Sequence, residues 1–200
     1  GGQTVPTNAD NVFFDANSFT LTTQTVTINV AAACANMNWT GVLNTPTLAG
    51  TSALEIKGSL TLVAGMSVTY TGSITFSATT TGQTITLAGQ TLKGYSSSTI
   101  IFDGVGGGWT FQDTFATDRN TLRLTNGTLN TNGQLVKIGQ IEFYPGGATL
   151  NLGASNVEFS GWSGDVIRNF AGATFTFNAG TSALKFLCGS CGINIPAITF

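Results

Sequence analysis

The sequence contains no histidine, and only 8% of its 200 residues are Asp, Glu, Lys or Arg. An average soluble protein carries about 25% of these four residues. The lack of histidine removes the most common general base and the most common transition-metal ligand of proteins. Nine acidic and seven basic residues give a net charge of −2. This leaves no basic field to attract nucleic acid or an anionic membrane.

Long hydrophobic runs are also missing. No run approaches the roughly 18 apolar residues of a membrane helix, so we expect no membrane insertion. The chain does not open with the charged and apolar regions of a signal peptide. It begins Gly-Gly-Gln-Thr and ends Ala-Ile-Thr-Phe, and we expect it to be a mature or excised piece of a longer protein. Few charges, scarce Cys and abundant Thr, Asn and Gly predict a secreted or cell-surface location.

Short segments in which apolar and polar residues alternate fill most of the chain. Gly- and Asn-containing corners separate these segments. Alternation places the apolar side chains on one side of each segment, which is typical of β-strands. The apolar pairs recur too unevenly for a strict hexapeptide or nonapeptide solenoid. Examples are Leu54/Ile56, Leu60/Leu62, Val68/Tyr70, Ile74/Phe76, Ile100/Phe102, Trp109/Phe111, Ile141/Phe143 and Leu150/Leu152.

The clearest unit covers residues 121–133, Thr-Leu-Arg-Leu-Thr-Asn-Gly-Thr-Leu-Asn-Thr-Asn-Gly. In an antiparallel β-sandwich, its Asn126-Gly127 pair would form a tight hairpin turn. In a parallel β-helix, or β-solenoid, the same pair would form a corner between two faces of one coil. Uneven gaps between the apolar pairs, and Thr, Ser and Asn at the outward positions, favour the β-helix.

We therefore expect residues 1–200 to form a single elongated β-solenoid segment with irregular coils. Coils of roughly 20–28 residues would give about eight turns and a rod near 40 Å long. Residues 31–50 are less regular and predict an irregular or capping element. Residues 188–200 predict either the start of a next module or an end cap. The open coil ends would join copies of the chain or neighbouring modules.

Four segments share one style of alternating, Asn- and Gly-rich sequence: Asn-Val-Phe-Phe-Asp-Ala-Asn-Ser-Phe at 11–19, Cys-Ala-Asn-Met-Asn-Trp-Thr-Gly-Val at 34–42, the unit at 121–133, and Thr-Leu-Asn-Leu-Gly at 149–153. These segments resemble repeat modules of very large secreted surface proteins of the Bacteroidota. The resemblance spans residues 8–162. It implies a secreted, repetitive, adhesin-like or filament-forming protein that is exported to the cell surface.

The motif Cys188-Gly-Ser-Cys191 has the spacing of a redox or metal site. A redox pair normally precedes a helix, whereas Gly-Ile-Asn-Ile-Pro follows here. A zinc site needs four ligands, and without histidine only Cys34 could add a third. These cysteines are therefore disulfide candidates. Either Cys188 pairs with Cys191, or one of them pairs with Cys34 or with a part of the protein outside this sequence.

Asp103, Asp113 and Asp118, with Arg119 and Arg123 nearby, suggest an alternative function. Clustered carboxylates serve polysaccharide-cleaving β-helices as acid and base or as calcium ligands. Asp before Gly is also ordinary turn chemistry. We therefore assign no catalytic residue, and a polysaccharide-binding or polysaccharide-cleaving β-helix is kept as the alternative function.

Two further groups are weaker candidates. Asp10 and Asp15 could hold a structural calcium ion through carboxylate oxygens, although the spacing of an EF-hand is absent. Tyr95 and Tyr144 lie in turns and could contact surface glycans. The expected function is a non-catalytic structural or adhesive segment of a surface protein or extracellular filament. A phage fibre or tailspike segment is a weaker alternative.

Overall fold

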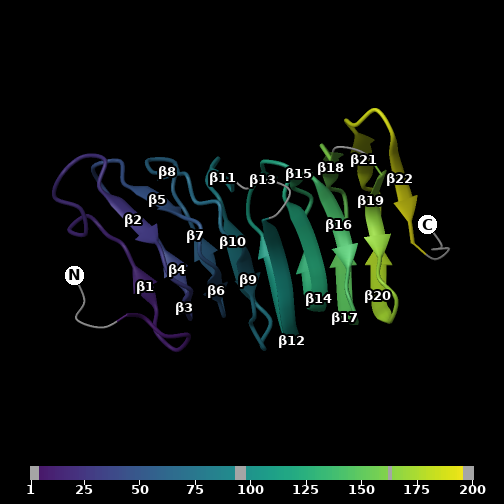
Figure 1. Cartoon of the computed structure of the whole chain (residues 1–200), viewed down its shortest axis with the longest axis horizontal. Helices are drawn as coiled ribbons and strands as arrows, with labels where there is room; N and C mark the ends of the chain where they lie inside the picture. Colours follow the sequence, from purple (N-terminus) through teal and green to yellow (C-terminus); the bar gives the residue numbers. More distant parts are fainter. Residues whose placement is uncertain (1–4, 93–97, 162–163, 196–200) are drawn as a thin grey trace.

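The computed structural model describes residues 5–92, 98–161 and 164–195. The strands wind in a continuous coil that advances along a rod from the N-terminus to the C-terminus (Figure 1). Every strand pair of the described residues is parallel, and those residues contain no helix. The predicted parallel β-helix is confirmed, and the alternative antiparallel β-sandwich is wrong.

Each turn of the coil contributes to three faces. The first face joins strands that pair edge to edge along the whole rod. It consists of β3 (Ala32–Cys34), β6 (Leu54–Ile56), β9 (Ile74–Phe76), the first parts of β12 (Thr99–Phe111) and β14 (Thr121–Asn130), β16 (Gln140–Phe143), β19 (Gly164–Asn169) and β22 (Cys191–Asn194).

The second face belongs to the same 14-stranded sheet, because β12 and β14 bend and run across both faces. Its strands are β1 (Val12–Phe13), β4 (Met37–Asn38), β7 (Leu60–Thr61), β10 (Gln83–Thr86), the second parts of β12 and β14, β17 (Gly146–Asn151) and β20 (Ala173–Asn178).

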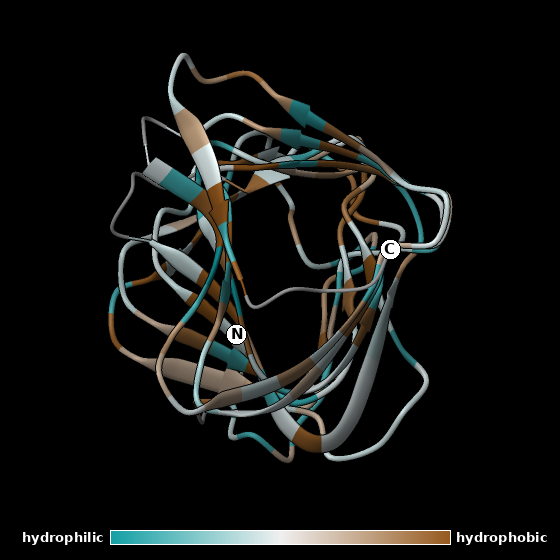
Figure 2. Cartoon of the chain, turned by 90° about the vertical axis from the view of Figure 1, so that its right-hand side faces the viewer, coloured by the Kyte–Doolittle hydropathy of each residue, from teal (hydrophilic) through white to brown (hydrophobic). Residues whose placement is uncertain are grey.

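The third face is divided into two sheets. The first sheet holds β2 (Thr25–Ile28), β5 (Thr47–Gly50) and β8 (Ser67–Val68); the second holds β11 (Thr91–Leu92), β13 (Phe115–Thr117), β15 (Leu135–Ile138), β18 (Asn156–Phe159) and β21 (Ala183–Phe186). Viewed from the C-terminal end, the three faces close around the core (Figure 2). The described strands make about eight turns.

The turns differ in length, as the uneven sequence pattern predicted. Stacked partners lie as few as 19 residues apart, as Arg123 and Glu142 do, and as many as 27 apart, as Leu150 and Phe177 do. Most strand pairs nevertheless keep one register, because a one-residue slip would turn their apolar side chains toward solvent. The exceptions are β12 with β14, which shifts register at the bend, and β19 with β22, which shifts between Asp165 and Ile167.

Asn126-Gly127 is a corner between two faces of the coil, not a hairpin turn. Gly127 has a φ of 91°, a conformation that glycine adopts at little cost. Asn126 Nδ2 donates to Asp103 Oδ1 of the preceding coil (2.8 Å), and the backbone N–H of Gly147 in the following coil donates to Asn126 Oδ1 (3.0 Å). The corners of three turns are therefore stacked through one asparagine side chain.

Two segments that were predicted to be irregular or to cap the rod, residues 31–50 and 188–200, contribute strands to the coil. Residues 31–50, predicted as an irregular or capping element, form β3, β4 and β5, one strand for each face. Both β4 and β5 pair with a strand on either side, so this segment is an ordinary turn. In the predicted terminal segment 188–200, β22 pairs with β19 and extends the first face. Residues 196–200 lie outside the described residues.

Inward-pointing side chains of all three faces form one continuous core. Aromatic rings stack between turns, as in the pairs Phe76–Phe102 (5.0 Å between centroids) and Phe143–Phe175 (4.1 Å), and within a turn, as in Phe111–Phe115 (4.2 Å). Burying each large side chain contributes about 1.5–3 kcal/mol. The largest fully buried side chains are Trp39, Trp109, Tyr70, Phe76, Phe102, Phe111, Phe115, Phe143, Phe159, Ile56, Leu60 and Leu62. The alternation seen in the sequence therefore builds this core.

Candidate functional site

The three aspartates proposed for a polysaccharide-cleaving site lie at three different corners of the coil. Asp103 lies at the bend of β12, Asp113 between β12 and β13, and Asp118 between β13 and β14. Asp103 binds the Asn126 amide, and Asp113 accepts hydrogen bonds from the backbone N–H of Leu87 (2.9 Å) and of the next residue. Glycoside hydrolysis needs two carboxylates that flank one bond, and the corners do not bring these three together.

The calcium candidates Asp10 and Asp15 lie in exposed turns that use their carboxylates locally. Asp10 accepts hydrogen bonds from the N–H and hydroxyl of Thr7 (2.9 and 2.7 Å). Asp15 accepts them from the N–H of Asn17 (2.9 Å) and the hydroxyl of Ser18 (3.0 Å). These bonds lower the pKa of both carboxyls, with the Thr7 hydroxyl and the Asn17 N–H as the largest causes. Calcium binding here stays a prediction. Over the described ranges, no three Cys, Asp or Glu residues form a group suited to a metal.

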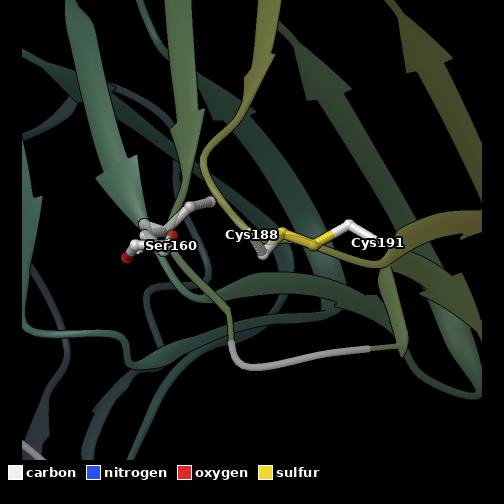
Figure 3. Close-up of a disulfide and its surroundings, with 4 residues drawn as sticks. Ser160, Cys188 and Cys191 are labelled. Carbon is white, nitrogen blue, oxygen red and sulfur yellow. Dashed lines mark hydrogen bonds between the residues drawn. A yellow bond between two sulfur atoms is a disulfide. The ribbon is translucent and has the colours of Figure 1, made fainter.

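Of the three disulfide candidates, Cys188 and Cys191 pair with each other. Their Cα atoms lie 5.9 Å apart, and the bridge closes the turn that joins β21 to β22 (Figure 3). Cys34 is a free thiol in the core, and burial, with Glu55 as a smaller cause, raises its pKa to about 11. Within the described chain, the bridge therefore fastens the last turn, and Cys34 acts as a core side chain.

The two tyrosines proposed for glycan contact have different outcomes. Tyr95 lies outside the described residues. Tyr144 follows β16 on the outer surface of the first face, where the guanidinium of Arg123 lies 3.8 Å from the centre of its ring. The ring of Phe170 packs against it at 4.3 Å. Tyr144 thus has two neighbours that limit the ring surface open to a sugar, and its role in glycan contact stays a prediction.

Tyr144 belongs to a cluster of five side chains, which we call the arginine–aromatic cluster: Arg123, Glu142, Tyr144, Arg168 and Phe170. Arg123, Glu142 and Arg168 are stacked in register on β14, β16 and β19. Arg123 donates to Glu142 Oε2 from Nε (3.2 Å) and Nη2 (3.0 Å). Arg168 donates from Nε (3.1 Å) and Nη2 to Oε1. Its guanidinium also lies 5.1 Å from the Phe170 ring centre. One carboxylate thus holds two guanidiniums.

Glu142 is buried although it points away from the core. Its neighbours Ile141 and Phe143 point inward, whereas its own side chain is covered by the two arginines and is 3% exposed. Gln140 Nε2 also donates to Oε1 (3.0 Å). A buried carboxylate is tolerated only when its charge and hydrogen bonds are satisfied. Both carboxylate oxygens of Glu142 meet this condition, because each accepts at least two hydrogen bonds.

A second charged row lies on the third face of the same three turns. Lys137, Glu158 and Lys185 are stacked in register on β15, β18 and β21. The distances to the Glu158 carboxylate are 3.9 Å from Lys137 Nζ and 3.1 Å from Lys185 Nζ. This lysine row repeats the charge order of the arginine–aromatic cluster, but its side chains are more exposed.

The N-terminal end of the rod carries an apolar hollow of about 350 Å³. It lies beside β1, β2 and β3, each of which pairs on one side only within the described chain. Its lining residues are Pro6, Val12, Phe14, Val26, Ile28, Ala32, Ala33, Cys34, Met37 and Leu54. Among the described residues, the core is therefore open at this end.

The C-terminal end is apolar as well. Phe186, Leu187 and Ile193 are 40%, 54% and 45% exposed. Among the described strands, β20, β21 and β22 each pair only with the preceding turn. Within the described part of the chain, each of the three faces ends in a strand with an unpaired edge, both at the N-terminal and at the C-terminal end of the rod.

Searches of known protein families, curated proteins and solved structures find no match to this chain. The described segments include no apolar helix of membrane-spanning length. The fold alone identifies the chain as a β-solenoid.

The sequence did not predict the arginine–aromatic cluster, since its charged partners are separated by 19 and 26 residues. In the sequence, Arg123 stands out only as a neighbour of the scattered aspartates.

Proposed function

We propose that this chain is a non-catalytic structural and adhesive segment of an extracellular β-solenoid rod. The parent would be a secreted surface protein or filament, of the kind that the resemblance to Bacteroidota repeat modules implies. Copies of the chain, or neighbouring modules, join through the coil ends. The observation that carries the proposal is the pair of open ends.

Free strand edges are ready to pair with another strand. In repeat proteins each unit contacts only its neighbours, so an end without a polar cap exposes core surface. The hollow at the N-terminal end and the exposed Phe186, Leu187 and Ile193 at the other end supply such surface. A further coil stacked on either end would bury these residues and satisfy the edges.

The outer surface supports a structural role because its polar residues stack on each other. Asn36 Nδ2 donates to Asn11 Oδ1 (2.7 Å), and Asn178 Nδ2 donates to Asn151 Oδ1 (2.6 Å), in both cases between adjacent turns. Such ladders hold the turns in register without charged groups. The dispersal of Asp103, Asp113 and Asp118 over three corners weighs against the polysaccharide-cleaving alternative.

Two measurements on the purified chain test this proposal. Electron microscopy is expected to show rods whose lengths are multiples of about 40 Å, the height of eight turns. Incubation with a panel of neutral and acidic polysaccharides is expected to release no reducing ends. Cleavage that disappears in Asp113→Ala would overturn the non-catalytic proposal and favour the polysaccharide-cleaving alternative.

A further inference from the structure

We infer that the arginine–aromatic cluster is a binding site for the anionic groups of an acidic polysaccharide. The inference deepens the adhesive part of the proposed function, and rests on it, by naming the ligand class and the residues that bind it. The site lies on the outer surface of the first face, where β14, β16 and β19 lie side by side (Figure 1).

Both guanidiniums keep donors for a ligand. Within the described chain, the hydrogen bonds to Glu142 use only Nε and Nη2 of Arg123 and Arg168. Arginine carries five N–H donors, so the Nη1 groups and one hydrogen on each Nη2 remain. The side chains of Arg123 and Arg168 are 27% and 39% exposed. Carboxylate and sulfate oxygens match the paired N–H groups of a guanidinium.

The charge of the cluster favours an anion. Two guanidiniums and one carboxylate leave a net charge of +1 at a site where the single carboxylate is buried. The surrounding chain adds to this, because residues 119–200 contain five basic and three acidic residues (net +2), whereas residues 1–118 contain two basic and six acidic residues (net −4). An anionic polymer is therefore attracted to the C-terminal half of the rod and repelled by the N-terminal half.

The cluster is also held in place before a ligand arrives. Arg123 is fixed between the Glu142 carboxylate and the Tyr144 ring, and Arg168 lies between the same carboxylate and the Phe170 ring. Tyr144 and Phe170 pack on each other at 4.3 Å. Preorganised side chains lose little freedom on binding. Among the described residues the lysine row has no such aromatic support, and it carries compact, strongly hydrated charges, which makes it the natural control.

The test measures binding of the full chain to polygalacturonate, to chondroitin sulfate and to neutral dextran at low salt, by isothermal titration calorimetry. The variants are Arg168→Gln, Arg168→Lys and Lys185→Gln. Arg168→Gln and Lys185→Gln each remove one positive charge from the same turn, one from the cluster and one from the lysine row. Arg168→Lys keeps the charge beside Glu142, so it provides a second variant if Arg168→Gln fails to fold.

We expect the native chain to bind an acidic polysaccharide and not dextran, with binding that weakens as salt is added. Arg168→Gln should weaken it about tenfold or more and Arg168→Lys about threefold or more, since both lose the guanidinium fork, whereas Lys185→Gln should change it less than about twofold. The two acidic polymers distinguish carboxylate from sulfate ligands.

Three results would overturn the inference: no binding of either acidic polymer, equal weakening by Arg168→Gln and Lys185→Gln, or equally tight binding of single-stranded DNA with the same variant pattern. The first two would leave only a structural ion-pair cluster, and the third would reassign the ligand. None of them bears on assembly through the coil ends, which uses other residues. Failure of this inference is therefore distinguishable from failure of the proposed function.

Discussion

Gly127 lies directly against Trp109 of the preceding turn. A Cβ atom at Gly127 would be 2.9 Å from Cζ3 of the Trp109 ring and 2.7 Å from the backbone oxygen of Gly104. The corner of β14 can therefore follow the bend of β12 only if residue 127 has no side chain. This contact turns an Asn-Gly pair, which often makes a hairpin, into a corner between two faces of a solenoid.

Replacing Gly127 by alanine should destabilise the protein more than the same change at Gly133. Both glycines have positive φ angles, 91° and 72°, but a Cβ at Gly133 would meet no atom within 4 Å. Gly133→Ala should thus cost only about 1–2 kcal/mol for the backbone conformation. Gly127→Ala should cost about 3 kcal/mol or more because overpacking is added. Urea unfolding measures both, and equal costs would contradict the close packing of this corner.

The buried carboxylate of Glu142 gives a second prediction. Glu142→Gln leaves Arg123 and Arg168 facing each other without their anion and should destabilise the chain by about 3–5 kcal/mol. Glu158→Gln makes the same change in the exposed lysine row and should cost about 1 kcal/mol or less. Urea unfolding of the native chain and the two variants measures both losses of stability. If both variants cost the same small amount, Glu142 is not the centre of a buried ion pair.

Tyr70 ties a corner where the third face is divided into two sheets. Its buried hydroxyl donates to the backbone oxygens of Ser52 (2.6 Å) and Ser73 (3.0 Å). Tyr70→Phe removes this donor from the Ser52 carbonyl, whereas the Ser73 carbonyl keeps the N–H of Leu54 (3.0 Å), and should destabilise by about 1–3 kcal/mol. Tyr144→Phe, at a half-buried surface position, should change the stability by less than about 0.5 kcal/mol. If Tyr70→Phe leaves the thermal unfolding temperature unchanged, these hydrogen bonds do not contribute to stability.

Cys34 should make stability depend on pH in alkaline solution. Burial, with Glu55 as a second cause, raises the pKa of its thiol from 9.0 to about 11. Between these values the unfolded chain loses the thiol proton and the folded chain keeps it. Stability is therefore retained below about pH 9 and falls as the pH rises toward about 11. The unfolding free energy of the native chain minus that of Cys34→Ala should fall as the pH rises over this range, because the variant lacks the titrating thiol. A constant difference would contradict the raised pKa.

The fold could be predicted because its physical cause is local. Pairs such as Leu122 and Leu124 mark the inward positions of a strand, and Asn126-Gly127 marks a corner. Residues 31–50 carry a weaker signal, since the small side chains of the alanines at 31–33 say little about pairing. Their neighbouring turns supply the pairing partners that make β3, β4 and β5 ordinary strands.

The arginine–aromatic cluster could not be predicted from the sequence. Its charged residues meet only because turns of unequal length bring Arg123, Glu142 and Arg168 into one row. Corner lengths set that register, and a corner can gain a residue without changing the strand pattern beside it. The bridge between Cys188 and Cys191 was one of several alternatives, and the turn between β21 and β22 brings these two together.

Joining of chains through their coil ends can be measured by sedimentation velocity over a range of concentrations. Leu187→Lys places a charge on the exposed C-terminal end, whereas Val105→Lys places it on an equally apolar but central position, where Val105 is 75% exposed. We expect elongated species whose mass grows with concentration for the native chain and for Val105→Lys, and a monomer for Leu187→Lys. A compact monomer in all three proteins, or equal loss of assembly in both variants, would contradict it.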